Sequence, residues 1–170
     1  MQGNKKVDKY ILRSLFVFGI GLLTFVLRKP PIKDWLLVYL WNAVTNGIID
    51  KVIVSYKIVQ YPTRQFPKLF KTNILFDYLL YPTMTIVYNQ FTDKDRPSII
   101  FLKLFYFTIP MLLIELWAER KTSLIEFKRS WKWYHSFISL NVKSLVTRLW
   151  IGWVRKVAEK QKIQESTNIN

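Results

Sequence analysis

The stretch SIIFLKLFYFTIPMLLIELW, residues 98–117, carries two charged side chains, Lys103 and Glu115, in twenty positions. An α-helix rises about 1.5 Å per residue, so about 20 residues cover the hydrocarbon core of a bilayer, which is about 30 Å thick. The stretch therefore predicts a membrane-spanning helix. Three further apolar runs predict helices of the same kind, over residues 10–27, 35–59 and 73–88.

Charge and composition agree with a membrane protein of one domain. Of the 170 residues, 51% are hydrophobic, and 26 Lys and Arg against 11 Asp and Glu give a formal charge of +15. In a soluble domain such a charge would indicate nucleic acid, because Lys and Arg neutralise phosphates. Here the basic residues flank the apolar runs, which is typical of attraction to anionic lipid headgroups. We expect the lipid bilayer and its anionic headgroups as partners, and no nucleic acid.

The chain contains few side chains that could act in catalysis or bind a catalytic metal. It has no cysteine and one histidine, His135, so thiolate metal sites and disulfides are excluded and zinc catalysis is not expected. Serine-nucleophile motifs, glycine-rich phosphate loops and metalloprotease helices are absent. We therefore expect no catalytic residue, no metal and no cofactor, and a protein that is not an enzyme.

The runs predict an all-α, polytopic membrane helical bundle with four transmembrane helices and a C-terminal amphipathic helix. Residues 1–157 form a single membrane-embedded helical domain in this interpretation, and residues 158–170 form a polar C-terminal tail that we expect to fray. Pro82 and Pro110 fall inside predicted spans, where neighbouring helices can satisfy the carbonyls that proline frees, so they predict kinks.

Residues 131–154 allow two interpretations. Their apolar side chains share one helical face, which suits a helix lying in the headgroup plane. The tryptophan pairs at 131/133 and 150/153 stand about one bilayer thickness apart, as in a spanning helix with aromatic belts. A span would place Lys143 in mid-membrane at a cost of about 3 kcal/mol. We favour the interfacial helix and keep a fifth span as the alternative. The apolar face contains Trp131, Tyr134, Ile138, Val142, Leu145, Leu149 and Trp153.

The distribution of Lys and Arg near the span ends predicts a cytoplasmic N-terminus. With this orientation the inner segments hold thirteen basic residues and the outer links hold five. The inner ones are Lys5, Lys6, Lys9, Arg13, Lys57, Arg64, Lys68, Lys71, Arg120, Lys121, Lys128, Arg129 and Lys132, and the outer ones are Arg28, Lys29, Lys33, Lys94 and Arg96.

Polar side chains inside the runs are the candidate functional residues. Asn42, Asn46 and Asp50 recur every four residues and form one stripe of the second helix, Asp77 lies on the third, and Glu115 on the fourth. Charged groups within spans almost always face protein or water and are candidates for function.

The predicted orientation places the three acids at similar depth, beside Arg13 and Lys51. Two or three carboxyl groups at one depth could form a cation or proton site. Alternatively, the acids and amides could form ion pairs and hydrogen bonds that hold the helices in register. We favour the second interpretation.

Three blocks resemble a known family. They are NILFDYLLYPTMTIVYNQFT at residues 73–92, ELWAERKTSLIE at 115–126 and WKWYHSFISL at 131–140. Together with the run that bears Asp50, they resemble an uncharacterised family of small multi-pass membrane proteins from spore-forming Gram-positive bacteria. The resemblance implies a bacterial cell (inner) membrane protein with four or five spans, and it supplies no catalytic residues.

These observations favour a non-enzymatic multi-pass inner-membrane protein with a structural or accessory role, alone, with a protein partner or as a homo-oligomer. The alternative is a small transporter or channel subunit with an intramembrane carboxylate site. A scaffold predicts acids already paired with basic residues or amides, whereas a transporter predicts a polar cavity that reaches the acids from one side. An enzyme acting on lipid would show a groove open laterally to the bilayer with a carboxylate near a second polar group.

Overall fold

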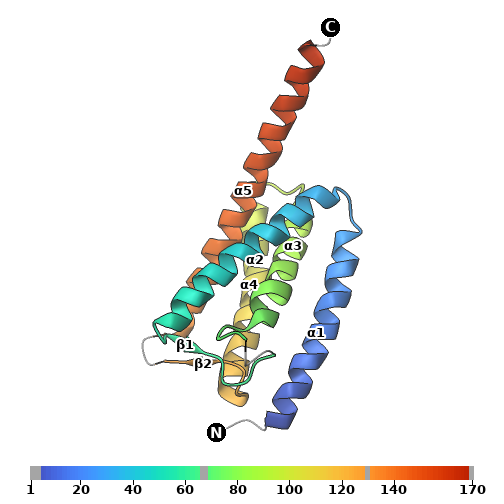
Figure 1. Ribbon diagram of the computed structural model, residues 1–170. Helices are drawn as coiled ribbons and strands as arrows, with labels where there is room; N and C mark the ends of the chain where they lie inside the picture. The colour runs from blue at the N-terminus through green and yellow to red at the C-terminus, as the bar shows by residue number, and fades with distance from the viewer. Residues whose placement is uncertain (1–4, 66–68, 129–130, 169–170) are drawn as a thin grey trace.

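The computed structural model describes residues 5–65, 69–128 and 131–168. In these residues it is all-α, as predicted, apart from two strands of two residues that pair antiparallel (Figure 1). The elements in chain order are α1 (Lys5–Leu27), α2 (Ile32–Ser55), β1 (Val59–Gln60), the π-helix η1 (Leu75–Leu80), α3 (Tyr81–Phe91), α4 (Pro97–Lys121), β2 (Glu126–Phe127) and α5 (Trp133–Asn168).

The helices run alternately in opposite directions along the bundle. In Figure 1, α1, α3 and α5 rise from the end that carries the β1–β2 pair, whereas α2 and α4 descend to it. We call this end, where α1 begins, the near end. The opposite end, which holds the α1–α2 link and the α3–α4 link, is the far end. The helix α5 continues well past the far end.

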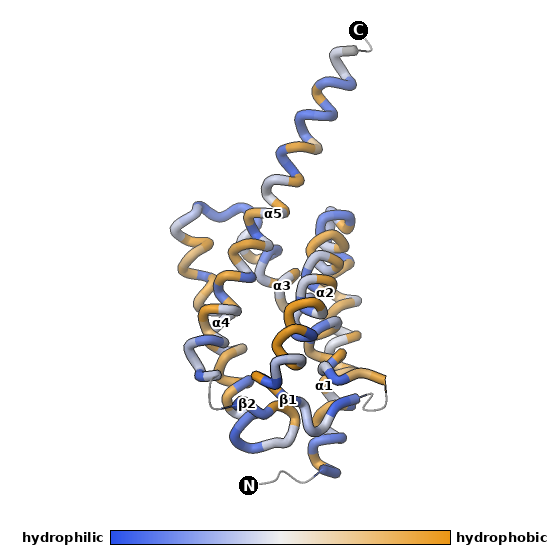
Figure 2. The backbone as a smooth tube through the Cα atoms, turned by 60° about the vertical axis from the view of Figure 1, so that its left-hand side comes forward, coloured by the Kyte–Doolittle hydropathy of each residue, from blue (hydrophilic) through white to orange (hydrophobic). Residues whose placement is uncertain are grey.

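Three helices, α1, α2 and α4, are long and apolar enough to cross a membrane. Apolar residues predominate in these helices between the two ends, with hydrophilic residues interspersed in α2, and hydrophilic residues are frequent in the links (Figure 2). The predicted runs at residues 10–27 and 98–117 lie within α1 and α4. The run at 35–59 is helical only to Ser55, because the chain turns at Lys57 with a positive φ of 56° and enters β1 at Val59.

The third predicted run is built differently from a regular spanning helix. Its first part is the π-helix η1, which passes directly into α3, and α3 contacts α1, α2 and α4. Its buried residues are Pro82, Thr83, Thr85, Ile86, Tyr88 and Asn89. Thr83, Thr85 and Asn89 can be buried because each donates to a carbonyl of its own helix four residues earlier, at 2.6–2.9 Å. This segment is the interior helix of the bundle.

The helix α5 contains most of residues 131–154, for which the sequence allows two interpretations. Its first part does not lie across the end of the bundle but runs along α4 and also contacts α2 (Figure 1). The expected apolar face points outward, with Ile138 56%, Leu149 73% and Trp153 63% exposed. The buried face is largely small or polar and consists of Ser136, Leu140, Ser144, Thr147 and Ile151. A helix that turns polar groups inward and apolar groups outward is suited to contact with acyl chains on its outer side.

The polar tail also differs from the expectation of a frayed end. The described part of residues 158–170 continues α5 to Asn168, and every residue from Lys156 to Thr167 is exposed. Extending an existing helix requires no new nucleation, and this tail contains the good helix formers Ala, Glu, Lys and Gln. The bundle therefore carries a helix that extends beyond it.

Candidate functional site

Pro82, which follows the π-helix η1, leaves two carbonyl groups of η1 without a donor from their own helix. Proline has no N–H, so Pro82 cannot donate to the carbonyl of Tyr78 four residues earlier or of Asp77 five residues earlier. Two side chains of α2 supply the missing donors. Asn46 Nδ2 donates to the Asp77 carbonyl at 2.9 Å, and the Tyr39 hydroxyl donates to the Tyr78 carbonyl at 2.6 Å. The irregular backbone thus ties η1 to α2.

Two glycines let neighbouring helices approach η1 closely. A Cβ atom on Gly47 of α2 would lie 2.0 Å from the Tyr78 hydroxyl, which is a severe overlap. A Cβ atom on Gly19 of α1 would lie 2.8 Å from Leu79 and 3.0 Å from Leu80. Small residues at helix contacts serve this purpose in membrane proteins. Both contacts bring α1 and α2 against the same π-helix.

The close approach of α2 to η1 brings two carboxyl groups together. Asp50 and Asp77 lie within hydrogen-bonding reach of each other, and Asp50 is 8% exposed. The Tyr61 hydroxyl, from the loop after β1, donates to Asp50 Oδ1 at 2.8 Å. The Oδ2 atoms of both acids are buried and have no donor. Two carboxyl groups can hydrogen-bond to each other only when they share a proton.

Tyr61 is held as a hydrogen-bond donor. Burial raises the pKa of its hydroxyl well above the usual value, and the nearby carboxyl groups of Asp50 and Asp77 raise it further. Tyr61 therefore keeps its proton and continues to donate to Asp50 across the physiological pH range.

The cation of this site comes from α5. Lys143 interacts electrostatically with both Asp50 and Asp77, and its Nζ atom lies 4.8 Å from the centre of the Tyr81 ring. A cation over an aromatic face gains about 0.5–2 kcal/mol. These interactions offset part of the cost of burying Lys143 between helices. We call Asp50, Tyr61, Asp77 and Lys143 the interior cluster.

The third candidate acid, Glu115 of α4, forms a separate chain of hydrogen bonds. Trp131 Nε1 donates to Ser136 Oγ at 2.9 Å, and Ser136 Oγ donates to Glu115 Oε1 at 2.8 Å. This chain joins α4 to the start of α5. His135 is next to it; its ring stacks on Trp131 and is tilted against Tyr134, and its Nδ1 accepts from the backbone N–H of Lys132 at 3.1 Å.

The two candidate amides serve contacts between helices. Asn42 is fully buried, donates to the Val38 carbonyl at 2.8 Å and accepts from the Thr147 hydroxyl of α5 at 3.3 Å. Asn46 holds the carbonyl of Asp77, as described above. Each of the five candidates, Asn42, Asn46, Asp50, Asp77 and Glu115, therefore takes part in a contact between two elements of the bundle.

The structure does not pair the candidate acids with Arg13 and Lys51, the basic residues that the sequence places at their depth. Arg13 and Lys51 are both exposed, and within the described residues neither forms an ion pair with an acid. Lys143 takes that place. Its signal in the sequence is that Lys143 is the one charged residue in the stretch 136–147, where a buried cation pairs best with an acid elsewhere in the bundle. Tyr61 had no such signal, because nothing in its loop indicates that it folds back on Asp50.

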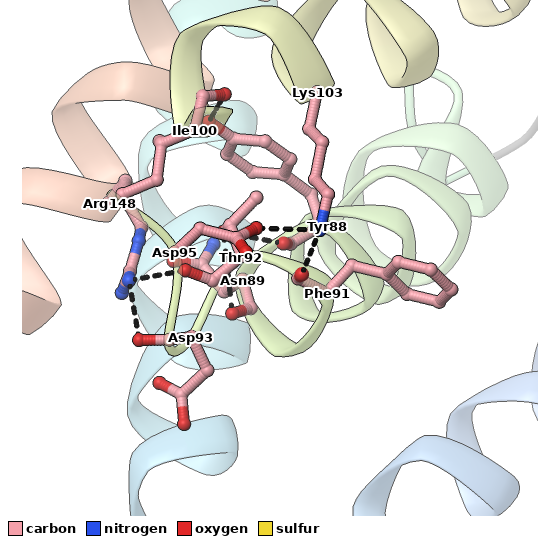
Figure 3. A network of polar contacts seen from close by, with 9 residues as sticks. All are labelled: Tyr88, Asn89, Phe91, Thr92, Asp93, Asp95, Ile100, Lys103 and Arg148. Atoms are coloured by element: carbon pink, nitrogen blue, oxygen red, sulfur yellow. Dashed lines mark hydrogen bonds and ion pairs between the residues drawn. The ribbon is translucent and has the colours of Figure 1, made fainter. Parts of the chain in front are cut away.

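Ion pairs dominate the far end. Arg155 Nε bonds to Asp34 Oδ2 at 2.5 Å, Arg155 Nη1 also pairs with Asp93, and Arg148 Nη2 donates to the carbonyls of Thr92 and Asp93 at 2.8 and 3.2 Å. Figure 3 shows Arg148 reaching the α3–α4 link from α5, with the Lys103–Asp95 ion pair (2.6 Å) across the same link. We call Asp34, Asp93, Arg148 and Arg155 the far-end clamp.

Among the surface recesses in the described part of the chain are two that no candidate acid lines. One, of about 520 Å³, lies at the far end beside Arg28 and Pro30. The other, of about 220 Å³, is lined by α1, α2, η1 and Gln65. Within the described residues, no group of three or more His, Asp or Glu side chains could hold a metal ion.

No known family model, curated protein or solved structure matches this chain. The resemblance of residues 73–92, 115–126 and 131–140 to small membrane proteins of spore formers therefore stays a prediction. Function has to be argued from the side chains and their geometry.

Proposed function

We propose that this protein crosses the bacterial cell membrane with five helices, namely α1, α2, the η1–α3 segment, α4 and α5. Three of them have the length and composition of spans. The η1–α3 segment is enclosed by the others, so it needs no apolar surface of its own. The outward apolar face of α5 supports the fifth span.

The N-terminus is cytoplasmic in this proposal. A spanning α5 adds five basic residues to the outer side, so the thirteen residues that the sequence assigns to the inner segments compare with ten on the outer side: Arg28, Lys29, Lys33, Lys94, Arg96, Arg148, Arg155, Lys156, Lys160 and Lys162. The excess of Lys and Arg on the cytoplasmic side is therefore smaller than it would be with an interfacial helix. Reporters fused to the two ends test it: the N-terminal reporter should be cytoplasmic and the one after Asn170 external.

Its role is structural or accessory and non-enzymatic. The observation that carries this role is the construction of α5. The far-end clamp fixes α5 to the bundle at Arg155, and beyond that residue α5 continues as an exposed helix. A helix held rigidly at one end and free along its sides is suited to contact a partner protein. The interior acids hold helices together in this interpretation.

A pull-down in mild detergent tests the accessory role. The full chain should co-purify with a partner at constant stoichiometry, and a chain ending at Val157 should lose it while staying in the membrane fraction. Glu165→Gln, a single change on the same exposed helix, serves as a control for handling and expression. Constant purification of the full chain alone, from every growth condition sampled, would contradict the proposal.

A second candidate, a small transporter or channel subunit, has one observation in its favour. Asp50 and Asp77 share an interior site with Lys143 but have unpartnered oxygens, as a proton or cation site requires. Proton flux into liposomes that contain the purified chain tests this function. Asp77→Asn should abolish flux and Asp95→Asn, at the far end, should not; flux that Asp77→Asn leaves unchanged removes the candidate.

A further inference from the structure

The smaller recess lies between α1 and α2 with η1 as its floor. Its walls are Phe16 and Ile20 of α1 and Tyr39 of α2, and the remaining lining comes from Gln65, Ile74, Leu75, Tyr78 and Leu79. In Figure 1, α1 and α2 meet at the far end and diverge toward the near end. Phe16 and Ile20 are 39% and 46% exposed, so the recess opens on the outer surface of the bundle.

The size and lining of the recess fit a hydrocarbon chain. A volume of about 220 Å³ holds about seven groups of the size of a water molecule, each of about 30 Å³, and a methylene group is of similar size. Most of the lining is aliphatic or aromatic. The polar groups of the lining residues are few: the Gln65 amide, the Tyr78 hydroxyl, which packs against Gly47, and the Tyr39 hydroxyl, which donates to the Tyr78 carbonyl.

A positive charge stands at the near-end border of this recess. Arg13 precedes Phe16 by three residues and Ile20 by seven, so the three side chains share one face of α1. Arg13 is exposed, and the described residues provide no acid for it. The uncharged part of the apolar run in α1 begins at the next residue, Ser14. We therefore place Arg13 at the depth where a phosphate meets the hydrocarbon core.

We propose that an anionic phospholipid binds here, with one acyl chain in the recess between α1 and α2 and its phosphate against Arg13. The charge on Arg13 complements a phosphate, and the recess accommodates the first part of a chain that hangs from it. This inference rests on the proposed membrane location. It adds a defined site to the general attraction of the basic residues for anionic headgroups.

Native mass spectrometry of the full chain in detergent, with equal amounts of phosphatidylglycerol and phosphatidylcholine, tests the phosphate contact. The chain should retain phosphatidylglycerol in preference to phosphatidylcholine. Arg13→Gln should weaken retention of phosphatidylglycerol about fivefold, the equivalent of about 1 kcal/mol for one basic residue. Arg120→Gln, the same change at an exposed position of α4, should leave retention unchanged.

A second pair of variants tests the chain-binding recess. Ile20→Trp fills the recess and should lower retention of both lipids, whereas Leu113→Trp, on the exposed face of α4, should not. Equal effects of Arg13→Gln and Arg120→Gln, or of Ile20→Trp and Leu113→Trp, would overturn the proposal. A dimer that excludes lipid and is lost on Ile20→Trp would also overturn it, by assigning the recess to a second copy of this chain.

Carbonate extraction separates failure of this inference from failure of the proposed function. A chain that stays in the membrane pellet but shows no preference for phosphatidylglycerol contradicts the lipid site alone. A chain released by carbonate contradicts the membrane location, and the lipid site with it.

Discussion

The interior cluster and the far-end clamp are both polar, but they are built in opposite ways. At the clamp, opposite charges touch, and Arg155 alone bonds to acids of two other elements. In the interior cluster, Asp50 accepts a hydrogen bond from the Tyr61 hydroxyl, Asp77 lies close to Asp50, and Lys143 lies over an aromatic ring. The described residues show no direct ion pair there.

Depth explains this difference. The clamp side chains of Arg155, Asp34 and Asp93 keep 20–29% of their surface exposed, so water still solvates their charges. The cluster lies between helices, where each separated charge is expensive. The clamp therefore serves to fix α5, whereas the cluster retains unpartnered oxygens that could bind a proton. Four substitutions test this contrast, in order of decreasing effect.

Lys143→Met should have the largest effect. It leaves two interior carboxyl groups without their cation, and removing one partner of a buried charged set costs about 3 kcal/mol. Unfolding by SDS titration in mixed micelles measures it. Lys51→Met, at the exposed lysine beside Asp50 in the sequence, should change the free energy of unfolding by less than about 0.5 kcal/mol. Equal losses of unfolding free energy in the two variants would indicate that Lys51, and not Lys143 alone, stabilises the interior acids.

Gly47→Ala should cost about 2 kcal/mol, because the new methyl group overlaps the Tyr78 hydroxyl and pushes α2 away from η1. Gly152→Ala is the matched control. A Cβ atom there meets nothing within 4 Å, so helix propensity should make this change neutral or stabilising by up to about 1 kcal/mol. Tyr78→Phe should restore part of the loss in Gly47→Ala, and absence of any rescue would contradict the assigned overlap.

Arg155→Gln should cost about 1–2 kcal/mol, because it removes two partly exposed ion pairs and the cation over the Trp35 ring. The loss should shrink as salt is added, since salt screens exposed charges. Lys156→Gln, the next residue, removes the same charge from an exposed position and should have almost no effect. Thermal unfolding in detergent at two salt concentrations measures both.

Ser136→Ala should cost about 0.6–1.7 kcal/mol, the range measured for hydrogen bonds between membrane helices. The change breaks the chain from Trp131 to Glu115 and leaves both ends without their bond. Ser139→Ala, on the exposed side of the same helix, should be neutral. A loss as large as that of Lys143→Met would mean that Glu115 belongs to the interior cluster.

The sequence predicted the helices better than their surroundings. Apolar runs placed α1 and α4 within a few residues of their bounds, because a long apolar helix needs few other signals. The four-residue spacing of Asn42, Asn46 and Asp50 correctly put them on one face that turns inward. The pattern in α5 identified an apolar face, and most of that face points away from the bundle. Whether α5 spans the bilayer or lies on it stays a prediction, because an amphipathic pattern fits both arrangements.

By itself, then, the sequence determined the class of fold and the helices that carry it, since hydrophobicity and length are properties of each segment alone. Only the tertiary structure decided that Lys143 and Tyr61 join Asp50 and Asp77, that Arg13 stands free, and that α5 runs along α4. Such pairings depend on the relative rotation and depth of helices far apart in the chain. A small rotation of a helix, or a small change in its depth, brings a different residue against a given neighbour. The local sequence does not determine either quantity.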